Sequence, residues 1–355
     1  METVRVELGP RSYSVALGAA DFGALVRAAL PRSTNALVVS DGNARAHADA
    51  VRQSLEAAGV ACSFALVPAG ESTKCLGELA TLLDALAAMP ADRQTVVVAV
   101  GGGVVGDLAG FAAAVYNRGI PLVMVPTTLL AMVDSSVGGK TGINHAAGKN
   151  LVGAFHQPAL VWAEPRFLDT LPAREYLSGL AEVVKYGVIL DPAFFAWLEA
   201  HAEALVRRDR TAVLHVVRRS CELKAHVVAQ DEREETGLRA VLNYGHTFAH
   251  AFETVGGYGA WLHGEAVSAG MCCAWKLAAK LGRVPPDVRQ AALLRRFQLP
   301  TEPLPAWSAE ELLAVMRRDK KAAAGALRFV LPTRLGHAEL VAVPEAAVRE
   351  ILRSP

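Results

Sequence analysis

Three histidines and one glutamate stand at spacings that suit a catalytic metal site. His246 and His250 are four residues apart, and His263 follows at the predicted start of the next helical segment. Side chains four apart on a helix share a face, and a third near the next helix start can fold back toward them. Glu182 lies in an otherwise apolar segment, 178–185. Two imidazoles and a carboxylate that leave one position open are typical of a catalytic zinc site.

Each of these residues also has a purely structural interpretation. A single histidine in an apolar helix is more often a hydrogen-bonded core residue than a metal ligand. Glu182 and Lys185, three residues apart, could form an ordinary ion pair along one helix. What favours a metal is that the three histidines fall in a region that also holds Arg239 and Asn243. The spacing by itself leaves both interpretations open.

A glycine-rich turn predicts a second kind of site. Gly101, Gly103 and Gly106 fit the pattern G-x-G-x-x-G, between a β-branched run at 95–100 and a small, apolar segment at 104–116. Such a turn lets backbone N–H groups at a helix start approach a pyrophosphate. The strand expected at 121–125 ends without the acid that holds a ribose in the usual fingerprint. We therefore predict a dinucleotide site outside the standard Rossmann order, although any tight strand-to-helix junction also needs glycines.

Several cations share a glycine-rich or apolar sequence context, which predicts a pocket for a small, highly anionic substrate. They are Lys140, Lys149 beside Asn150, Lys185, Lys224, Arg239 and Lys320. A surface role is accepted instead for Arg207, Arg208, Arg210, Arg218 and Arg219. The sequence Gly138-Gly139-Lys140-Thr141 resembles the end of a P-loop, but the first glycine of that pattern would fall on Asp134.

These residues must be positioned by two kinds of element. Strands expected at 4–8, 12–17, 36–40, 62–67, 95–100 and 121–125 alternate with helices, which predicts a parallel sheet covered on both faces. After Thr170 the pattern becomes helical, at 172–190, 192–205, 209–230, 237–255, 263–282, 286–297 and 308–318, with a late hairpin at 327–331 and 338–341. We predict an α/β NAD-binding domain, 1–170, and a mainly helical domain for metal and substrate, 171–355.

Composition excludes several classes of function. The 355 residues are 52% hydrophobic and carry a formal charge of +1, so no global field would recruit nucleic acid or an acidic membrane. No apolar run reaches the length that spans a bilayer, and no secretory signal is recognisable at the N-terminus. Five cysteines without a C-x-x-C pair suggest neither a disulfide framework nor a thiolate zinc site. We expect a cytoplasmic protein with reduced thiols.

With these residues identified, the chain resembles the 3-dehydroquinate synthases of the sugar phosphate cyclase superfamily. The motifs that carry the resemblance are GGGVVGDLAGF, VPTTLLAMVDSSVGGKTGIN, GKNLVGAFHQP, FLDTLPAREYLSGLAEVVKYG, CELKAHVVAQDERE, LNYGHTFAHAFE, HGEAVSAGM and RRDKKAAAGALRFVLP. They follow one another through nearly the whole chain. The resemblance implies a lyase of the shikimate pathway that converts 3-deoxy-D-arabino-heptulosonate 7-phosphate to 3-dehydroquinate and phosphate, with NAD recycled in each turnover.

The resemblance also implies a role for each matched position. Zinc, with cobalt as the alternative metal, would be held by Glu182, His246 and His263, which leaves His250 on the substrate side. NAD would be held by Asp41, Asn43, Glu71, Lys74, Gly102, Gly103, Val104, Val105, Gly106, Asp107, Thr127, Thr128, Lys140, Lys149, Phe167, Leu168, Asp169 and Thr170. Substrate would meet Arg118, Asp134, Lys140, Lys149, Asn150, Lys185, Lys224, Arg239, Asn243, His250 and Lys320. Catalysis is implied for Lys140, Lys185, His250, Arg239, Asn243 and Asp134.

In this family Arg118 would reach the phosphate in the neighbouring subunit, so a homodimer is implied as well. Two departures from the family pattern stand out. The segment 231–237 is one acid longer, which leaves open whether Glu234 or Glu235 takes the family role, and Ala249 replaces a common glycine.

Two rival activities remain. A sibling cyclase of the 2-epi-5-epi-valiolone or 2-deoxy-scyllo-inosose synthase type acts on a substrate without a carboxylate, and would not need both Lys224 and Arg239. A polyol dehydrogenase would need no phosphate-binding lysines such as Lys140, Lys149 and Lys185. A nucleotide-binding module without activity is disfavoured because Glu182, His246 and His263 are all present.

Overall fold

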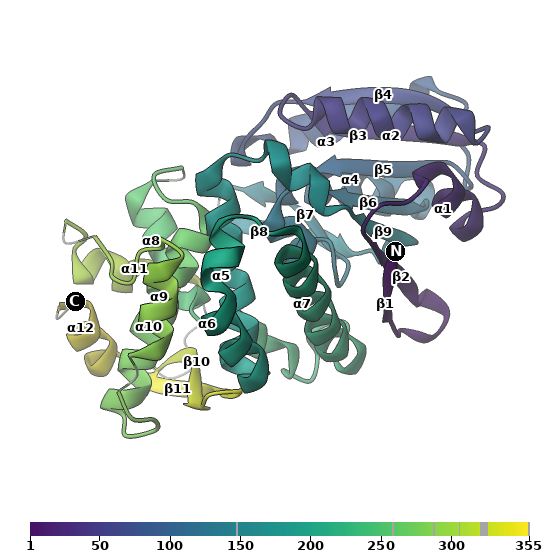
Figure 1. Cartoon of the computed structure of the whole chain (residues 1–355). Helices are drawn as coiled ribbons and strands as arrows, with labels where there is room; N and C mark the ends of the chain where they lie inside the picture. Colours follow the sequence, from purple (N-terminus) through teal and green to yellow (C-terminus); the bar gives the residue numbers. More distant parts are fainter. Residues whose placement is uncertain (147, 258, 287, 305, 320–325, 354–355) are drawn as a thin grey trace. The chain divides into compact units, whose positions relative to one another are not determined.

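The chain folds into two compact units. The computed structural model in Figure 1 describes residues 1–146, 148–257, 259–286, 288–304, 306–319 and 326–353. The first unit comprises Met1–Leu171 together with Ser220–Arg233, and the second comprises Pro172–Arg219 and Glu234–Pro355. Among the described residues, no helix is both long and apolar enough to cross a membrane.

The first unit contains a seven-stranded sheet. Its strands are β1 (Glu2–Val6), β2 (Tyr13–Leu17), β3 (Asn35–Asp41), β4 (Ala61–Val67), β5 (Val96–Gly101), β6 (Leu122–Pro126) and β9 (Leu160–Ala163). Its helices are α1 (Phe22–Ala29), α2 (Arg45–Ala57), α3 (Leu76–Ala88) and α4 (Gly103–Val115). β1 pairs antiparallel with β2, and all other neighbours pair parallel. The predicted parallel sheet is confirmed.

The strand order creates a switch point in the middle of the sheet. The order is β1-β2-β9-β6-β5-β3-β4, so the chain leaves β3 toward one edge and continues from β5 toward the other. β3 and β5 are direct neighbours, with Ser40 opposite Val100. The loops after their carboxyl ends, at Asp41 and Gly101, therefore start side by side. In open α/β sheets this is the place where ligands bind.

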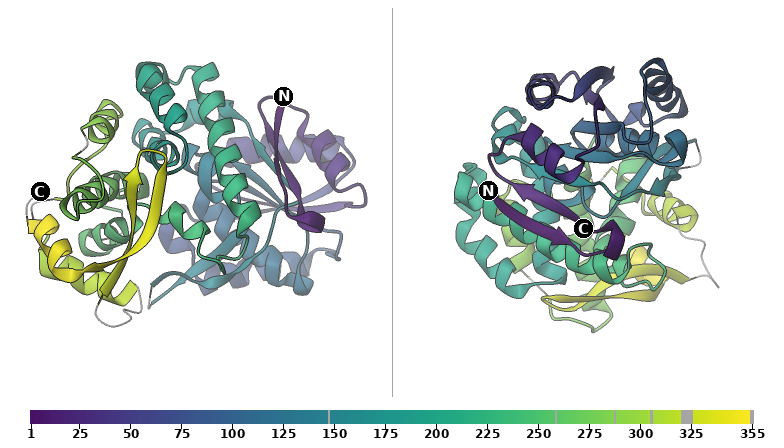
Figure 2. Two further views of the ribbon diagram at one scale, coloured as in Figure 1. Left: turned by 90° about the horizontal axis from the view of Figure 1, so that it is seen from below. Right: turned by 90° about the vertical axis from the view of Figure 1, so that its right-hand side faces the viewer.

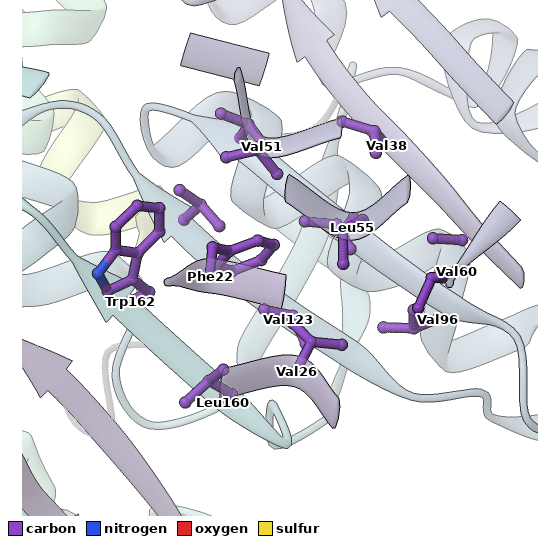
Figure 3. Packing of buried hydrophobic residues seen from close by; sticks show 14 of the residues in the cluster. Phe22, Val26, Val38, Val51, Leu55, Val60, Val96, Val123, Leu160 and Trp162 are labelled. Carbon is purple, nitrogen blue, oxygen red and sulfur yellow. The ribbon is translucent and has the colours of Figure 1, made fainter. Parts of the chain in front are cut away.

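Buried aliphatic side chains hold α1 and α2 against one face of the sheet, as Figure 3 shows. Phe22 of α1 stacks on Trp162 of β9 with ring centroids 5.1 Å apart. Alternate residues of the strands, such as Val123 and Val125 of β6, join this core. Met124 between them points to the other face, where it lies against Gly106 of α4. Both faces of the sheet are thus covered.

A two-stranded hairpin that the sequence analysis did not predict follows β6. β7 (Lys140–His145) pairs antiparallel with β8 (Gly148–Phe155), and the register shifts between Ile143 and His145. The approach is close, because a Cβ on Gly142 would lie 2.6 Å from the carbonyl oxygen of Val152. Only glycine fits there. Gly138 and Gly139, which resemble a P-loop end, lie directly before β7, and the carbonyl oxygen of Gly139 accepts a hydrogen bond from the backbone nitrogen of His156.

The second unit is mainly helical, as predicted. Its elements are α5 (Ala173–Ile189), α6 (Pro192–Val206), η6 (Arg239–Asn243), α8 (His246–Gly256), α9 (His263–Lys280), α10 (Arg289–Arg296), α11 (Ala309–Asp319), β10 (Ala326–Arg334), β11 (His337–Pro344) and α12 (Glu345–Arg353). The late hairpin is present as β10 and β11, seen as a separate ribbon in Figure 2.

One predicted helix of the second unit is wrong. The segment 237–255 was expected to be continuous, but it forms the short η6, a corner at Tyr244 and Gly245, and then α8. Gly245 has φ +81°, in the left-handed region, and a Cβ there would lie 2.8 Å from the backbone nitrogen of Met271. The close packing of α9 therefore decides the break, and the helical periodicity does not report it.

The helix α7 (Arg210–Gln230) begins in the second unit, and its later turns belong to the first. The predicted second domain, 171–355, included the whole of it. Within the first unit, the thiol of Cys221 lies 3.3 Å from the carbonyl oxygen of Met132. Glu232, just beyond the helix, accepts hydrogen bonds from Arg11 and Gln157. These contacts draw Ser220–Arg233 into the first unit.

Candidate functional site

Glu182, His246 and His263 form a compact cluster in the second unit. One potential ligand atom from each lies within 4.8 Å of the others. Glu182 is fully buried on α5, and the two histidines are the first residues of α8 and α9. Oε1 of Glu182 is 3.6 Å from Nε2 of His246 and 3.8 Å from Nε2 of His263. The spacing of the histidines left a metal site and an ordinary core as alternatives, and the family resemblance implied these three residues as the ligands.

The carboxylate of Glu182 is poorly satisfied for a buried group. Its Oε2 forms an ion pair with Nζ of Lys185, which is itself buried. Its Oε1 has no hydrogen-bond partner among the described residues. A buried polar atom left in this state costs free energy, unless another group binds it. An oxygen without a donor beside two imidazole nitrogens fits a divalent cation such as Zn²⁺.

Hydrogen bonds on the far side of each ring orient the two histidines. Nδ1 of His246 is 3.1 Å from the carbonyl oxygen of Tyr244, and Nδ1 of His263 is 3.4 Å from Oε1 of Glu253. A ring that donates from Nδ1 presents the lone pair of Nε2, here toward Glu182. Such partners are the usual support of metal-bound histidines.

The protonation state of His246 agrees with this geometry. Burial lowers its pKa well below the ordinary value, and the nearby Lys185, His263 and His250 lower it further. The neutral imidazole is the form that binds a metal. His250 lies one turn along α8, with its ring centroid 5.7 Å from that of His246, and is not part of the three-residue cluster.

The predicted dinucleotide turn lies at the switch point of the first unit. Gly102 is the N-cap of α4, so the first N–H groups of this helix face the end of β5. Gly101, Gly102 and Gly106 line a small pocket together with Pro126 and Ser135. A Cβ on Gly103 would lie 3.1 Å from Oγ of Ser135. The glycines thus keep the helix start open to an approaching group, as a phosphate site requires.

Asp41, at the end of β3, shapes the neighbouring loop. Its Oδ1 accepts hydrogen bonds from the backbone nitrogens of Asn43 at 2.9 Å and Ala44 at 3.0 Å. This is the turn-forming role that the residue type alone would suggest. At the far end of the unit's main segment, Oγ1 of Thr170 lies 2.9 Å from Nε2 of His47, on α2.

The buried Lys74 is the centre of a polar network in the first unit. Its Nζ donates to Oδ2 of Asp107 at 2.7 Å and to Oδ1 of Asn150 at 2.5 Å. Glu71 lies 3.7 Å away. Burial raises the pKa of Asp107, and the charge of Lys74 offsets part of that rise. Residues predicted to bind NAD and residues predicted to bind substrate therefore belong to one network.

Lys224, on the part of α7 that belongs to the first unit, pairs with Asp134. Its Nζ lies 2.5 Å from Oδ1 and 2.7 Å from the backbone carbonyl oxygen. Arg239, in the second unit, is 2% exposed, and its Nε lies 3.7 Å from Oε1 of Glu234. Lys140 and Arg118 are exposed. Lys320 lies outside the described residues.

Sequence reasoning missed three residues that support the site: Asn144, Tyr244 and Glu253. Glu253 is 5% exposed. Its place as an acid among apolar residues is a signal that the sequence does contain. Nothing local marks the other two. Tyr244 contacts His246 through its backbone carbonyl oxygen, and Asn144 accepts a hydrogen bond from the opposite strand of the β7–β8 hairpin.

Solved structures with this fold include two sugar phosphate cyclases. A 2-deoxy-scyllo-inosose synthase complexed with carbaglucose-6-phosphate, NAD⁺ and Co²⁺ superposes with a TM-score of 0.89 at 27% identity, over 99% of both chains. The 2-epi-5-epi-valiolone synthase from Streptomyces hygroscopicus subsp. jinggangensis 5008, with NAD⁺ and Zn²⁺ bound, gives 0.87 at 29% identity, over 98% of this chain and 96% of that one. The fold is that of the sugar phosphate cyclases.

Family models and curated relatives narrow this class. The models for the N-terminal and C-terminal parts of 3-dehydroquinate synthase match residues 64–178 and 179–322. The 3-dehydroquinate synthase of Rhodospirillum rubrum is 52% identical, over 94% of this chain and 90% of its own. That of Laribacter hongkongensis is 52% identical, over 90% of this chain and 88% of its own. The chain belongs to the 3-dehydroquinate synthase family.

Proposed function

We propose that this protein converts 3-deoxy-D-arabino-heptulosonate 7-phosphate to 3-dehydroquinate and inorganic phosphate. The observation that carries the proposal is an intact metal-fitting cluster, Glu182, His246 and His263, in a chain of this family. A degraded cluster would instead have pointed to a relative without activity. The conversion is an elimination followed by ring closure, so the enzyme is a lyase without net redox change.

NAD and Zn²⁺ are the proposed cofactors, with Co²⁺ able to replace zinc. The support is the pair of likenesses to cyclases solved with NAD⁺ and Zn²⁺ or Co²⁺, and the geometry of this chain. NAD would lie along Asp41, Glu71, Lys74 and the turn at Gly102, and zinc at the three-residue cluster. When bound, NAD supplies a reversible hydride acceptor, and zinc supplies a positive charge beside a ring alcohol and the ketone formed from it.

The chain's own cations would bind the anionic ends of the substrate. Lys140, Lys149 and Asn150 are assigned to the phosphate, and Lys224 and Arg239 to the carboxylate. The last two are 6% and 2% exposed, so their charges have been withdrawn from water before the substrate arrives. A buried cation binds an anion more strongly than an exposed one, because less solvent screens the pair.

The remaining residues would guide proton movement. Once the alcohol is a ketone, the adjacent C–H is acidic; its proton passes to a phosphate oxygen, the C–O bond to phosphate breaks, and a C=C bond forms. Lys185, Asn243 and His250 would hold the oxygens of the ring during this step, and Asp134 would keep Lys224 oriented. With the alcohol restored, ring opening would give a carbonyl and an enolate that join in an intramolecular aldol closure, and the enzyme's main part would be to hold a productive conformation.

A homodimer is also proposed, with Arg118 reaching the substrate phosphate of the second subunit. Arg118 is exposed in a loop with φ +65°, at the end of α4. Nε2 of His156, just after β8, lies 2.9 Å from the carbonyl oxygen of Ile120 in the same loop, and β8 exposes Leu151, Val152 and Phe155. Light scattering tests the dimer. Mixing an Arg118→Ala chain with a Glu182→Gln chain should restore part of the activity, because one site of the mixed dimer has both residues.

The reaction is tested by phosphate release from purified, zinc-loaded protein with catalytic NAD. Three substrates are offered in parallel: the heptulosonate 7-phosphate, sedoheptulose 7-phosphate and glucose 6-phosphate. Release from the first alone, without net NADH, supports the proposal. Release only from one of the others would make the protein a sibling cyclase, and NADH accumulation on a polyol without phosphate release would make it a dehydrogenase.

A further inference from the structure

Asn144 occupies an irregular position in the β7–β8 hairpin. Ile143 pairs with Val152 and His145 pairs with Gly148, so Asn144 faces the three residues 149–151 of β8. Asn150 lies within this bulge with φ +54°, in the left-handed region. Bulges of this kind redirect side chains and interrupt the ladder, so the groups within them need other partners. Lys149 and Asn150, both assigned to ligand binding above, are displayed by it.

The side chain and backbone of Asn144 supply those partners. Its Oδ1 accepts from the backbone nitrogen of Asn150 at 3.0 Å, and its own backbone nitrogen donates to the carbonyl oxygen of Lys74 at 2.8 Å. Nζ of Lys74 donates in turn to Oδ1 of Asn150. The three residues close a ring of hydrogen bonds. The second end of the amide, Nδ2, donates to Oε1 of Glu71 at 2.8 Å.

Asn144 thus joins two segments that are far apart in the sequence. One is the turn at Glu71–Lys74, assigned above to NAD, and the other is the bulge at Lys149–Asn150, assigned to the substrate phosphate. Only a side chain with both a donor and an acceptor at one end can serve Glu71 and Asn150 together. Non-glycine residues rarely adopt the backbone conformation of Asn150. If its N–H lost this hydrogen bond, the conformation would be less stable and Asn150 could leave it.

We infer that Asn144 is a positioning residue that fixes the phosphate-binding bulge relative to the cofactor-binding turn. The inference rests on the proposed function, since it takes its ligands from there. It concerns a residue that need not touch either ligand. The two polar atoms of its amide have separate roles: Oδ1, the acceptor, holds the bulge, and Nδ2, the donor, holds Glu71.

Two substitutions separate these two ends. Asn144→Ala removes both, and we expect the Kd for NAD and the KM for the sugar phosphate each to rise about tenfold, the effect of one lost hydrogen bond to a charged or constrained group. Asn144→Asp keeps the acceptor for Asn150 but sets a carboxylate against Glu71. We expect it to weaken NAD about tenfold while the KM for the sugar phosphate stays within about threefold of the parent.

Amide hydrogen exchange of the ligand-free protein gives a readout that does not depend on the reaction. We expect peptides covering 148–155 to exchange about tenfold faster in Asn144→Ala and at the parental rate in Asn144→Asp. Asn35→Ala is the matched control, because Asn35 lies on another strand of the same unit and its side chain donates only to Thr34 in the described structure. It should match the parent in every measurement.

The outcomes are distinct. Parental exchange, Kd and KM in Asn144→Ala would overturn the inference, and so would a lower Tm with unchanged Kd and KM, which would mean an ordinary structural role. If Asn144→Ala does not fold, the split predicted for Asn144→Asp decides. If the parent releases phosphate from no sugar phosphate, the proposed reaction fails, while exchange and NAD titration still decide the role of Asn144.

Discussion

The metal cluster of the second unit is built around a buried carboxylate, whereas the Lys74 network of the first unit is built around a buried cation. Around Glu182, one buried carboxylate faces Lys185 and two imidazoles, and its Oε1 has no hydrogen-bond donor among the described residues. Around Lys74, one buried cation is shared by Asp107, Asn150 and Glu71, and the hydrogen bonds are short. In the first arrangement one carboxylate oxygen still lacks a partner, whereas in the second the charge of Lys74 is met within the protein itself.

This difference separates binding from preorganisation. A group with an unmet need gains most from its ligand, so the cluster at Glu182 should depend on zinc for its geometry. A group whose need is already met holds its position before the ligand arrives, so the Lys74 network should keep its shape in the empty protein. We therefore expect substitutions in the metal cluster to reduce zinc binding and activity, and substitutions in the Lys74 network to reduce stability.

The largest effect is expected from Glu182→Gln, which breaks the metal cluster. The amide removes the negative charge that balances the cation, and we expect bound zinc to fall below one tenth of an equivalent and phosphate release to fall about a thousandfold. Elemental analysis and the phosphate assay measure the two. Glu175→Gln, on the exposed side of the same helix, should retain both. Full zinc content in Glu182→Gln would contradict the assignment.

The next effect concerns stability of the first unit. Lys74→Met leaves the partly buried Asp107 without its cation, which we expect to cost about 3 kcal/mol of unfolding free energy at pH 7. The pKa of Asp107, already raised by burial, would rise further, because Lys74 is what lowers it. A raised carboxyl pKa stabilises the fold at low pH and loses that effect as pH rises, so the deficit should shrink on acidification toward pH 4.

Urea unfolding at several pH values measures this. Lys280→Met is the matched control, since Lys280 forms an exposed pair with Glu350. We expect that substitution to change stability by less than about 1 kcal/mol. A deficit in Lys74→Met that is equally small would mean that the network contributes no more than a surface pair.

A third test changes the backbone beneath the metal cluster. Gly245→Ala places a methyl group 2.8 Å from the backbone nitrogen of Met271 at φ +81°, and we expect a loss of about 2 to 3 kcal/mol with weaker zinc binding, because His246 is the next residue. Gly257→Ala, at φ +80° beyond the other end of α8, meets nothing within 4 Å. It should cost about 1 kcal/mol and leave zinc affinity unchanged. Equal zinc loss in both would point to general strain.

The smallest effect is expected far from both regions. Hydrogen bonds from Arg317, and then from Arg349, lower the pKa of Glu345 to about 2. Its contribution to stability is therefore present above pH 4.5 and lost as pH falls toward 2. The pairs are exposed, so Glu345→Gln should cost at most about 1 kcal/mol at pH 7 and nothing at pH 2. Thermal unfolding at both pH values tests this, and 1 M salt should remove most of the difference.

Much of the architecture could be predicted from local pattern. The β-branched run before Gly101 and the small residues after it identify a buried strand and its helix, and the structure has β5 and α4 there. The spacing of His246, His250 and His263 gave a metal site as one of two interpretations, although the predicted helix 237–255 placed His246 inside a helix and not at its first residue, where the structure has it. These features could be predicted because apolar periodicity and the residues of a tight turn are both local properties of neighbouring residues.

Two of the unpredicted features depend on residues distant in sequence. The break at Gly245 is imposed by Met271. The transfer of Ser220–Arg233 to the first unit follows from contacts with Met132 and Arg11. No window of neighbouring residues contains these partners, so propensity could not report them.

The sequence by itself determined the kinds of chemistry available: a glycine turn for a pyrophosphate, two imidazoles and a carboxylate for a metal, and lysines for anions. Tertiary structure alone decided how those groups are paired. It made Asp107 and Asn150 the partners of Lys74, and it left Oε1 of Glu182 beside two imidazoles. Residue type fixes which interactions a side chain can make, whereas burial and distance, which arise only when the chain folds, fix which of them it does make.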